Sequence, residues 1–311
     1  RLENISLIIL VYSLILNIKD TLTFKNIYFN YLKTFIKLSK PNYVITFIDN
    51  DTRFYRFKKY LRNIKFIAIQ NGYRFFKDDL FESIENSKYI FECDEYYCYG
   101  DQVKNYLKNK IRSKFFTIGS LKNNFCIKKE NIQKTNICFI SSYKISSNRH
   151  EKKILQSLYD FCFNKKIKLI ILARTNLEEE ENFYLNILKN KNFIFHKQNN
   201  DSCSSYKIID SAMVSITLNS TLGYENLARN NKTYFININD RNLDCISFLQ
   251  FGYPEKYDDE GFFWTNKFNP SSTIKKINDI YNLSDAEWKN RTSYLINKLI
   301  VYDKHNQFIR K

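Results

Sequence analysis

Short apolar runs alternate with amphipathic helical segments along most of the chain. Runs rich in Ile, Val and Phe with both faces apolar are typical of parallel strands whose sheet is covered on both sides. The predicted strands are Tyr43–Ile48, Phe66–Ile69, Tyr96–Tyr99, Phe115–Ile118, Ile137–Ile140, Leu169–Leu172, Phe193–Phe195, Met213–Leu218 and Thr233–Ile236. The predicted helices are Thr21–Leu38, Asp101–Lys110, Arg149–Asn164, Leu177–Lys189, Leu222–Arg229, Ser271–Tyr281 and a closing helix from Ser284 onward. This alternation predicts the α/β class.

A polar stretch, Lys122–Thr135, interrupts the alternation and has the composition of a linker. We therefore expect two doubly wound, Rossmann-like parallel-sheet domains facing each other across a cleft. The first would span residues 1–122, the linker 123–135, and the second domain, with the closing helix, 136–311. In open α/β sheets, ligands bind beyond the carboxyl ends of the strands, so the cleft is the expected site.

The apolar run Ile5–Leu16 is too short to cross a bilayer, which needs about 20 residues. It also lacks the small residues of a signal-peptide cleavage site. We expect a buried strand or helix there. The chain begins with Arg1 rather than Met, so we expect the first domain to lack its first strand.

Composition and charge narrow the classes of partner. The chain has 311 residues, of which 44% are hydrophobic, enough for two domain cores. Its net charge of +17 suggests an anionic partner: a nucleotide, a nucleic acid or a membrane surface. Abundant Lys, Asn, Ile, Phe and Tyr resemble the codon choice of an AT-rich genome, so many lysines would be surface filler. No basic run alternates with aromatic residues, and nucleic acid is therefore not an expected partner.

Cysteine and histidine positions argue against a metal site. The seven cysteines match no zinc or disulfide spacing, and Cys138 and Cys162 fall within apolar patterns. We expect reduced, partly buried thiols in a cytoplasmic protein. His150, His196 and His305 are scattered, so no metal site is predicted.

The segment Asn219-Ser-Thr-Leu-Gly-Tyr-Glu225 follows the apolar run Ala212–Leu218 directly. A turn from strand to helix leaves backbone N–H groups unpaired at the helix start, where they can bind an anion. Ser220 and Thr221 add hydroxyl groups for a phosphate, and Glu225, one turn later, suits a sugar hydroxyl. The alternative is an N-capped core helix with a surface glutamate.

Glycine is scarce, with 6 in the chain, so its positions are informative. Gly72, Gly119 and Gly223 stand just past predicted strands, and Gly100 follows Tyr99. Glycine permits a positive φ or a close approach of a ligand, although each could also be an ordinary turn residue.

Further candidates for the second domain follow its predicted strands. Arg174 ends the segment Lys168-Leu-Ile-Ile-Leu-Ala-Arg174 and could bind phosphate oxygens with both arms of its guanidinium. Alternatively it is a rim arginine paired with one of Glu178–Glu181. Ser141 and Ser142 follow the first strand of that domain and are either ligand contacts or caps.

In the first domain, Asp49 and Asp51 flank Asn50 at a predicted strand end. Either carboxylate could act as the general base that deprotonates a sugar hydroxyl. The alternative for both is an Asx turn or a helix N-cap.

The segment Gln70-Asn71-Gly72-Tyr73-Arg74 follows the next strand. The amides of Gln70 and Asn71 suit a hydroxyl-rich ligand, and Arg74 suits an anionic group. With Asn50 and Gly72 these residues form the predicted acceptor side.

These segments together resemble a known family. The matching motifs, in order, are Pro41-Asn-Tyr-Val-Ile-Thr-Phe-Ile-Asp-Asn50, Ile69-Gln-Asn-Gly72, Tyr99-Gly-Asp101, Thr117-Ile-Gly-Ser120 and Ser220-Thr-Leu-Gly-Tyr-Glu225. They resemble bacterial surface-carbohydrate biosynthesis proteins of the GT-B glycosyltransferase type, relatives of Kdo transferases and capsule polymerases. The resemblance spans Pro41 to Ile236, and its last motif is the most specific.

The resemblance implies a glycosyltransferase that moves a sugar from a nucleotide-sugar to a lipopolysaccharide, capsule or other surface-glycan acceptor. The second domain would bind the donor, with Ser220 and Thr221 at its phosphates and Glu225 at its ribose. The first domain would bind a glycan or lipid-linked acceptor. Neither a metal nor a cofactor is implied. Many relatives have His where Asn71 stands, and a catalytic residue from the first strand loop is expected to be missing.

Two alternatives stay open: a sugar-nucleotide 2-epimerase, against which the few histidines count, and a non-catalytic nucleotide- or glycan-binding paralogue. The expected location is cytoplasmic, with peripheral attachment to the anionic inner face of the cytoplasmic membrane left open.

Overall fold

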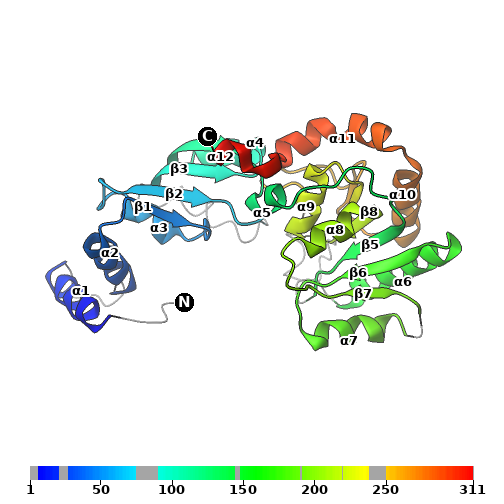
Figure 1. Ribbon diagram of the computed structural model, residues 1–311, viewed down its shortest axis with the longest axis horizontal. Coiled ribbons are helices and arrows are strands. Elements are labelled where there is room, and N and C mark those ends of the chain that lie inside the picture. The colour runs from blue at the N-terminus through cyan, green and yellow to red at the C-terminus, as the bar shows by residue number, and fades with distance from the viewer. Residues whose placement is uncertain are drawn as a thin grey trace. The chain divides into compact units, whose positions relative to one another are not determined.

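A computed structural model describes residues 6–20, 27–74, 90–143, 148–189, 191–218, 220–237 and 250–310 (Figure 1). The chain divides into two compact units. Of the described residues, the first unit contains 6–20, 27–71, 90–97 and 106–116. The second contains 72–74, 98–105 and those from 117 onward.

The first unit is built on a four-stranded sheet of order β1-β2-β3-β4. The strands are β1 (Tyr43–Thr46), β2 (Lys65–Ile69), β3 (Glu92–Cys98) and β4 (Arg112–Thr117). β2 pairs in parallel with both β1 and β3. Phe54 of α3 (Thr52–Phe57) packs edge-on against Phe66 of β2, with ring centroids 5.5 Å apart. Two further helices, α1 (Leu7–Asp20) and α2 (Ile27–Ser39), pack against each other (Figure 1).

The second unit holds a six-stranded sheet of order β10-β9-β8-β5-β6-β7, with parallel pairing throughout. The strands are β5 (Asn136–Ile140), β6 (Lys168–Leu172), β7 (Ile194–His196), β8 (Ala212–Thr217), β9 (Thr233–Ile236) and β10 (Trp264–Thr265). The chain runs outward from β5 to β7 and then continues on the other side with β8. The strand order therefore reverses between β5 and β8, the position at which doubly wound sheets bind ligands.

The remaining helices lie between the strands of both sheets and after the last strand. They are α4 (Asp101–Lys108), α5 (Leu121–Phe125), α6 (Asn148–Asn164), α7 (Glu178–Ile187), α8 (Ser204–Asp210), α9 (Thr221–Ala228), α10 (Pro270–Asn282), α11 (Asp285–Leu299) and α12 (Gln307–Arg310). α11 begins with a capping box between Ser284 and Glu287, and its Trp288 is fully buried.

The predicted α/β class is confirmed, and each predicted strand overlaps an observed one. The two-residue strand β10 was missed because two residues carry no periodicity. The short helices α5 and α8 were missed, because helices of five and seven residues give little periodicity. The helix α3 agrees with the N-cap alternative for the aspartates at 49 and 51. Residues 21–26, the start of one predicted helix, lie outside the described part.

The prediction that Ile5–Leu16 is buried is wrong. The segment forms the helix α1, but Leu7 and Ile8 are 72% and 80% exposed. An apolar run favours burial, but it is buried only where another segment of the fold packs against it.

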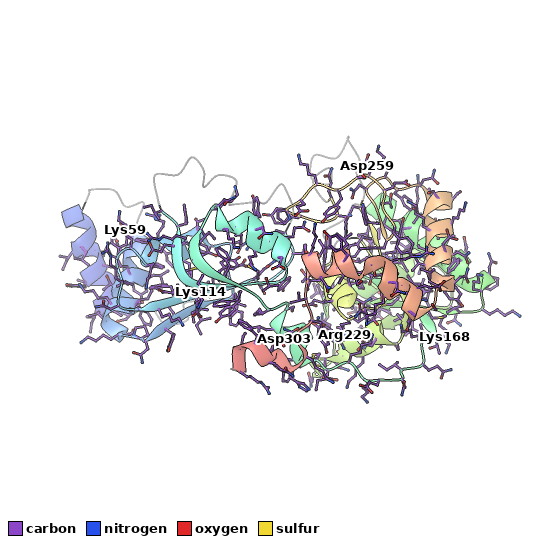
Figure 2. The ribbon with its side chains drawn as sticks, turned by 90° about the horizontal axis from the view of Figure 1, so that it is seen from above. Lys59, Lys114, Lys168, Arg229, Asp259 and Asp303 are labelled. Atoms are coloured by element: carbon purple, nitrogen blue, oxygen red, sulfur yellow. A yellow bond between two sulfur atoms is a disulfide. The ribbon has the colours of Figure 1, made fainter. Side chains whose placement is uncertain are left out.

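Residues of the predicted linker make firm contacts within the second unit. The Arg229 guanidinium, labelled in Figure 2, is buried and pairs with Asp210, with Nη2 2.5 Å from Oδ2. Its Nη1 donates to the carbonyl oxygens of Asn123 and Cys126, at 3.3 and 2.7 Å. The amine of Lys128 donates to the Arg229 carbonyl oxygen at 2.8 Å. The domain boundary at 123–135 stays a prediction.

The expectation of reduced cysteines is wrong for one pair. Cys126 and Cys203 form a disulfide, and 77 positions separate them in the sequence. Spacing alone could not reveal a bond that depends on tertiary contact. Cys93, Cys98, Cys138 and Cys162 are buried and form no disulfide within the described part of the chain, and Cys245 lies outside it.

Candidate functional site

The edge of the second sheet where the strand order reverses brings two predicted segments together. β5 and β8 are neighbours, and Ile140 pairs with Thr217 at their carboxyl ends. Ser141 and Ser142 follow the first strand, and Ser220 and Thr221 follow the second after a short turn. Asn219 lies outside the described residues. The structure thus brings these predicted donor residues to one edge of the sheet.

The start of α9 has the N-cap that the alternative interpretation of this segment predicted. The Ser220 hydroxyl accepts from the Leu222 N–H at 3.3 Å, and the Ser220 N–H donates to Thr217 Oγ1 at 3.0 Å. Thr221 Oγ1 accepts from the Tyr73 N–H at 3.1 Å. A hydroxyl that accepts one bond still has a hydrogen to donate.

Gly223 has a packing role. A Cβ at this position would lie 2.5 Å from Thr217 Cγ2 and 3.2 Å from the Phe235 ring. The missing side chain therefore lets α9 approach β8 and β9 closely, as at helix–strand contacts of nucleotide-binding folds.

Glu225 is buried, so it is not the surface glutamate of the alternative interpretation. Its carboxylate accepts from Ser120 Oγ at 2.5 Å and from the Tyr206 hydroxyl at 2.9 Å. Burial raises the pKa of Glu225, although these two hydrogen bonds oppose the shift. Because both carboxylate oxygens already have donors, a ribose hydroxyl would have to share or replace one of them.

Glu180, which the sequence did not single out, organises the loop after β6. It is fully buried and accepts from Ser141 Oγ at 2.5 Å. The N–H groups of Arg174 and Thr175 donate to it at 2.8 and 2.7 Å, and the Thr175 hydroxyl at 2.6 Å. One carboxylate thus fixes Ser141 and the backbone of the Arg174 loop.

A second buried carboxylate lies beside it. Tyr184 donates its hydroxyl to Glu151 at 2.6 Å and is also 2.7 Å from Ser141 Oγ. Ser142 Oγ lies 3.2 Å from the same Glu151 oxygen. Burial, followed by the charge of Glu151, raises the pKa of Tyr184, so its hydroxyl stays protonated and donates.

Arg174 itself is exposed at the carboxyl end of β6. Its Nη1 donates to the Tyr143 carbonyl oxygen at 2.8 Å, while its backbone N–H contacts Glu180. The interaction with the acidic run is therefore made by the backbone, and the guanidinium lies on the loop side.

In the first unit, the two predicted catalytic aspartates differ in environment. Asp51 is the N-cap of α3, and Arg53 pairs with it, Nη2 to Oδ2, at 2.7 Å. The N-cap alternative is confirmed for Asp51. Asp49 is buried and accepts from the Tyr96 hydroxyl at 2.5 Å and from the Asn71 N–H at 3.2 Å.

The predicted acceptor residues divide between the units. Asn50 and Asn71 are exposed in the first unit, and Gln70 is buried there, its N–H bonded to the Tyr97 carbonyl oxygen at 3.0 Å. Gly72 and Arg74 are half-buried and belong to the second unit. A Cβ on Gly72 would lie 3.1 Å from Thr221 Oγ1, so this glycine allows a close approach to α9.

Tyr73 and Tyr224 were missed as site residues. Their rings stack face to face with centroids 3.5 Å apart and planes 3° apart, and the Tyr73 hydroxyl donates to the Leu299 carbonyl oxygen at 2.7 Å. Burial raises the pKa of Tyr73 well above its usual value. Each tyrosine directly follows the glycine of a recognised motif, and this position could have identified both as site residues.

Within the described ranges, no group of His, Cys, Asp and Glu side chains could hold a metal ion. No helix among the described residues is long and apolar enough to cross a membrane.

Solved structures share this fold at low sequence identity. The chain matches a glycosyltransferase from Rickettsia africae with a TM-score of 0.50, 11% identity, and coverage of 93% of this chain and 82% of that one. It matches a Methanocaldococcus jannaschii UDP-GlcNAc 2-epimerase, solved with UDP-GlcNAc and UDP, with a TM-score of 0.53, 14% identity, and coverage of 92% and 79%. The GtfA/B complex gives a TM-score of 0.52 at 10% identity; 90% of this chain is covered, but only 59% of that one.

No curated protein is significantly similar in sequence. A family model described as "putative O-antigen biosynthesis protein" matches residues 67–153 and 148–311. These ranges cover most of the chain, including both sides of the strand-order reversal. The chain therefore belongs to this family of O-antigen biosynthesis proteins.

Proposed function

We propose that the protein is a glycosyltransferase that moves a sugar from a nucleotide-sugar to a growing O-antigen or related surface glycan. Membership of the O-antigen biosynthesis family supports a role in making this surface glycan. The fold match to a structure that contains UDP-GlcNAc and UDP supports a nucleotide-sugar ligand. The single observation that favours it most is the convergence at the β5–β8 reversal. There, Ser142 and the hydroxyls of α9 meet at an edge suited to phosphates.

In this proposal, the phosphate or diphosphate of the donor binds at the start of α9. Thr221 donates a hydroxyl hydrogen bond, and Arg174 contacts a phosphate from the loop after β6. Glu180 holds that loop by accepting hydrogen bonds from the N–H groups of Arg174 and Thr175. The exposed guanidinium can exchange its bond to a carbonyl oxygen for a stronger charge-assisted bond to phosphate.

Calorimetric titration with a panel of UDP-, GDP- and CMP-sugars tests donor binding directly. Arg174→Gln should weaken binding of the preferred donor by about ten- to a hundredfold, because a hydrogen bond to a charged group contributes about 1.5–3 kcal/mol. Arg291→Gln, at an exposed arginine of α11, is the matched control and should bind normally. Equal donor affinity in both variants would remove Arg174 from the site.

For the acceptor, we propose Asp49 as the general base in preference to Asp51. Asp51 already caps α3 and pairs with Arg53, whereas Asp49 lies at the carboxyl end of β1 beside Asn71. Asp49→Asn should abolish transfer while donor affinity is retained. Asp51→Asn is the matched control and should lower stability through the weakened cap, with transfer retained.

A 2-epimerase is the second candidate, favoured by the fold match to a solved UDP-GlcNAc 2-epimerase. Nuclear magnetic resonance of UDP-GlcNAc incubated with the protein distinguishes the two. An epimerase produces a C2-inverted sugar still bound to UDP. A transferase moves the sugar slowly to water or rapidly to an acceptor hydroxyl, and UDP is released. Tight donor binding with neither product would indicate a non-catalytic binding protein.

A further inference from the structure

Exposed apolar side chains gather on α1 of the first unit. Leu7, Ile8, Val11 and Ile15 lie along one helical face and are 72%, 80%, 49% and 47% exposed. The helix has no charged residue before Lys19. Its other side packs on α2, and the Ser6 N–H donates to the Tyr31 hydroxyl of α2 at 3.1 Å. An apolar face of this kind needs a covering partner.

Two basic side chains on and near α2 lie over tyrosine rings. The Arg53 guanidinium lies over the ring of Tyr28, at 4.7 Å from its centroid. The Lys33 amine lies 5.0 Å from the centroid of Tyr60. Both tyrosines are about half exposed. Aromatic rings with one polar end, placed beside cations, are typical of surfaces at the boundary between lipid and water.

Within the described part of the chain, Lys33, Lys37 and Lys40 form no ion pair with an acid. Residues 27–65 contain nine Lys or Arg and two Asp; Asp49 is buried and Asp51 pairs with Arg53. Lys33, Lys37 and Lys40 recur along one side of α2 and its end, and Lys59 is exposed near Tyr60 (Figure 2). Two of the nine have acidic partners outside this range: Lys58 pairs with Asp94 and Lys65 with Glu95.

We infer that this α1–α2 surface, formed by the exposed face of α1 and the basic side of α2, binds an anionic phospholipid membrane. α1 has 14 residues, whereas a spanning helix needs about 20, so it would lie in the plane of the interface. Leu7, Ile8, Val11 and Ile15 would enter the acyl boundary while Lys37 and Lys40 contact the lipid phosphates. This surface belongs to the first unit alone and is independent of the proposed glycosyl transfer.

A second copy of the chain is the other occupant to consider. A two-fold dimer would set the same patch against itself. Lys33, Lys37 and Lys40 would then face their own copies, and like charges across an interface disfavour association. An anionic lipid surface can bury the apolar side chains of α1 and attract the positive charges of α2.

Co-sedimentation with vesicles tests the inference. The protein should bind phosphatidylcholine vesicles that contain phosphatidylglycerol, bind them less at high salt, and bind pure phosphatidylcholine weakly. Ile8→Glu should lower apparent vesicle affinity by at least about tenfold, because the lost burial of an isoleucine is replaced by a charge. Lys37→Gln and Lys40→Gln should each lower it about fivefold at low salt.

Matched controls come from the second unit. Phe163→Glu on α6 alters a helical apolar side chain that is 70% exposed, and Lys275→Gln alters an exposed lysine of α10. Both should bind vesicles like the unaltered protein. All variants change exposed side chains, so far-ultraviolet circular dichroism and melting temperatures should be unchanged.

Three results would overturn the inference. The first is no binding to anionic vesicles even at low ionic strength. The second is equal loss of binding in Ile8→Glu and Phe163→Glu. The third is a dimer in sedimentation velocity that Ile8→Glu dissociates while vesicle binding stays unaffected, which would assign the α1–α2 surface to a second copy. Titration of Ile8→Glu with the nucleotide-sugar donor is a separate measurement and should give unaltered affinity. Failure of the membrane proposal can therefore be distinguished from failure of the proposed donor binding.

Discussion

Tyr73 stacks on Tyr224 with ring centroids 3.5 Å apart and an interplanar angle of 3°. Tyr73 directly follows Gly72, the last residue of one motif of the family resemblance, and Tyr224 follows Gly223 within another. The backbone of Tyr73 also donates to Thr221, three residues before Tyr224. Gly72 lets its segment approach α9 closely, and the stacked tyrosines pack these two chain segments together.

Tyr73→Phe and Tyr73→Leu separate the two roles of this side chain. Tyr73→Phe should destabilise by about 1 kcal/mol, because the Leu299 carbonyl oxygen loses its donor. Tyr73→Leu should lose about 0.5–1.5 kcal/mol more, because the stack on Tyr224 disappears as well. Urea unfolding measures both, with Tyr294→Leu, at a tyrosine 77% exposed, as the neutral control. Equal stability of Tyr73→Phe and Tyr73→Leu would contradict the importance of the stack.

Gly223→Ala should destabilise the protein although alanine is the better helix former. The added methyl would meet Thr217 Cγ2 at 2.5 Å, and overpacking of this kind costs about 1–3 kcal/mol. Thr217→Ser removes that methyl but keeps the hydroxyl that accepts from Ser220. A double-mutant cycle by thermal unfolding should therefore show rescue, which is partial because the Phe235 ring remains 3.2 Å away. Additive effects would show that the contact with Thr217 is not the cause.

Glu225→Gln should change how stability depends on pH. Burial raises the pKa of Glu225 in the folded state above its ordinary value of 4.5, so folding favours the protonated carboxyl. The stability from this group is therefore complete below pH 4.5 and is lost as pH rises through the folded-state pKa. The glutamine variant does not titrate, so its stability relative to the unaltered protein should increase with pH. Urea titrations from below pH 4.5 to neutral pH measure the difference, and a constant difference would contradict the assignment.

Glu180→Gln should lower both stability and donor affinity. The amide nitrogen of glutamine cannot accept a hydrogen bond, so the two donors on one of the former carboxylate oxygens lose their acceptor. These donors are either the Thr175 N–H and hydroxyl, or the Arg174 N–H and the Ser141 hydroxyl. A buried unsatisfied donor costs about 1–3 kcal/mol, which should appear as a lower melting temperature. Glu178→Gln, on the exposed side of the same helix, is the control and should leave both unchanged. Loss of stability with normal donor affinity would limit Glu180 to a structural role.

The α/β class could be predicted because its signal is local. Strands such as Ile137–Ile140 and Leu169–Leu172 are apolar on both faces, and this pattern together with helices between the strands is typical of a parallel sheet covered on both sides. The turn after Thr217 was also recognisable, since Ser220 is the residue type that caps a helix. The burial of Glu225 was not recognisable, because its donors come from Ser120 and Tyr206, distant in sequence.

The sequence by itself therefore determined the order of strands and helices, the capped turn at Ser220 and the resemblance to surface-carbohydrate enzymes. Only the tertiary structure decided that Glu180 and Glu151 lie behind Ser141 and Ser142, that Cys126 meets Cys203, and that the face of α1 is uncovered. The reason is physical. Hydrophobic periodicity and capping act within a few residues along the chain, whereas hydrogen bonds between buried groups, disulfides and exposure depend on which distant segments the fold brings together.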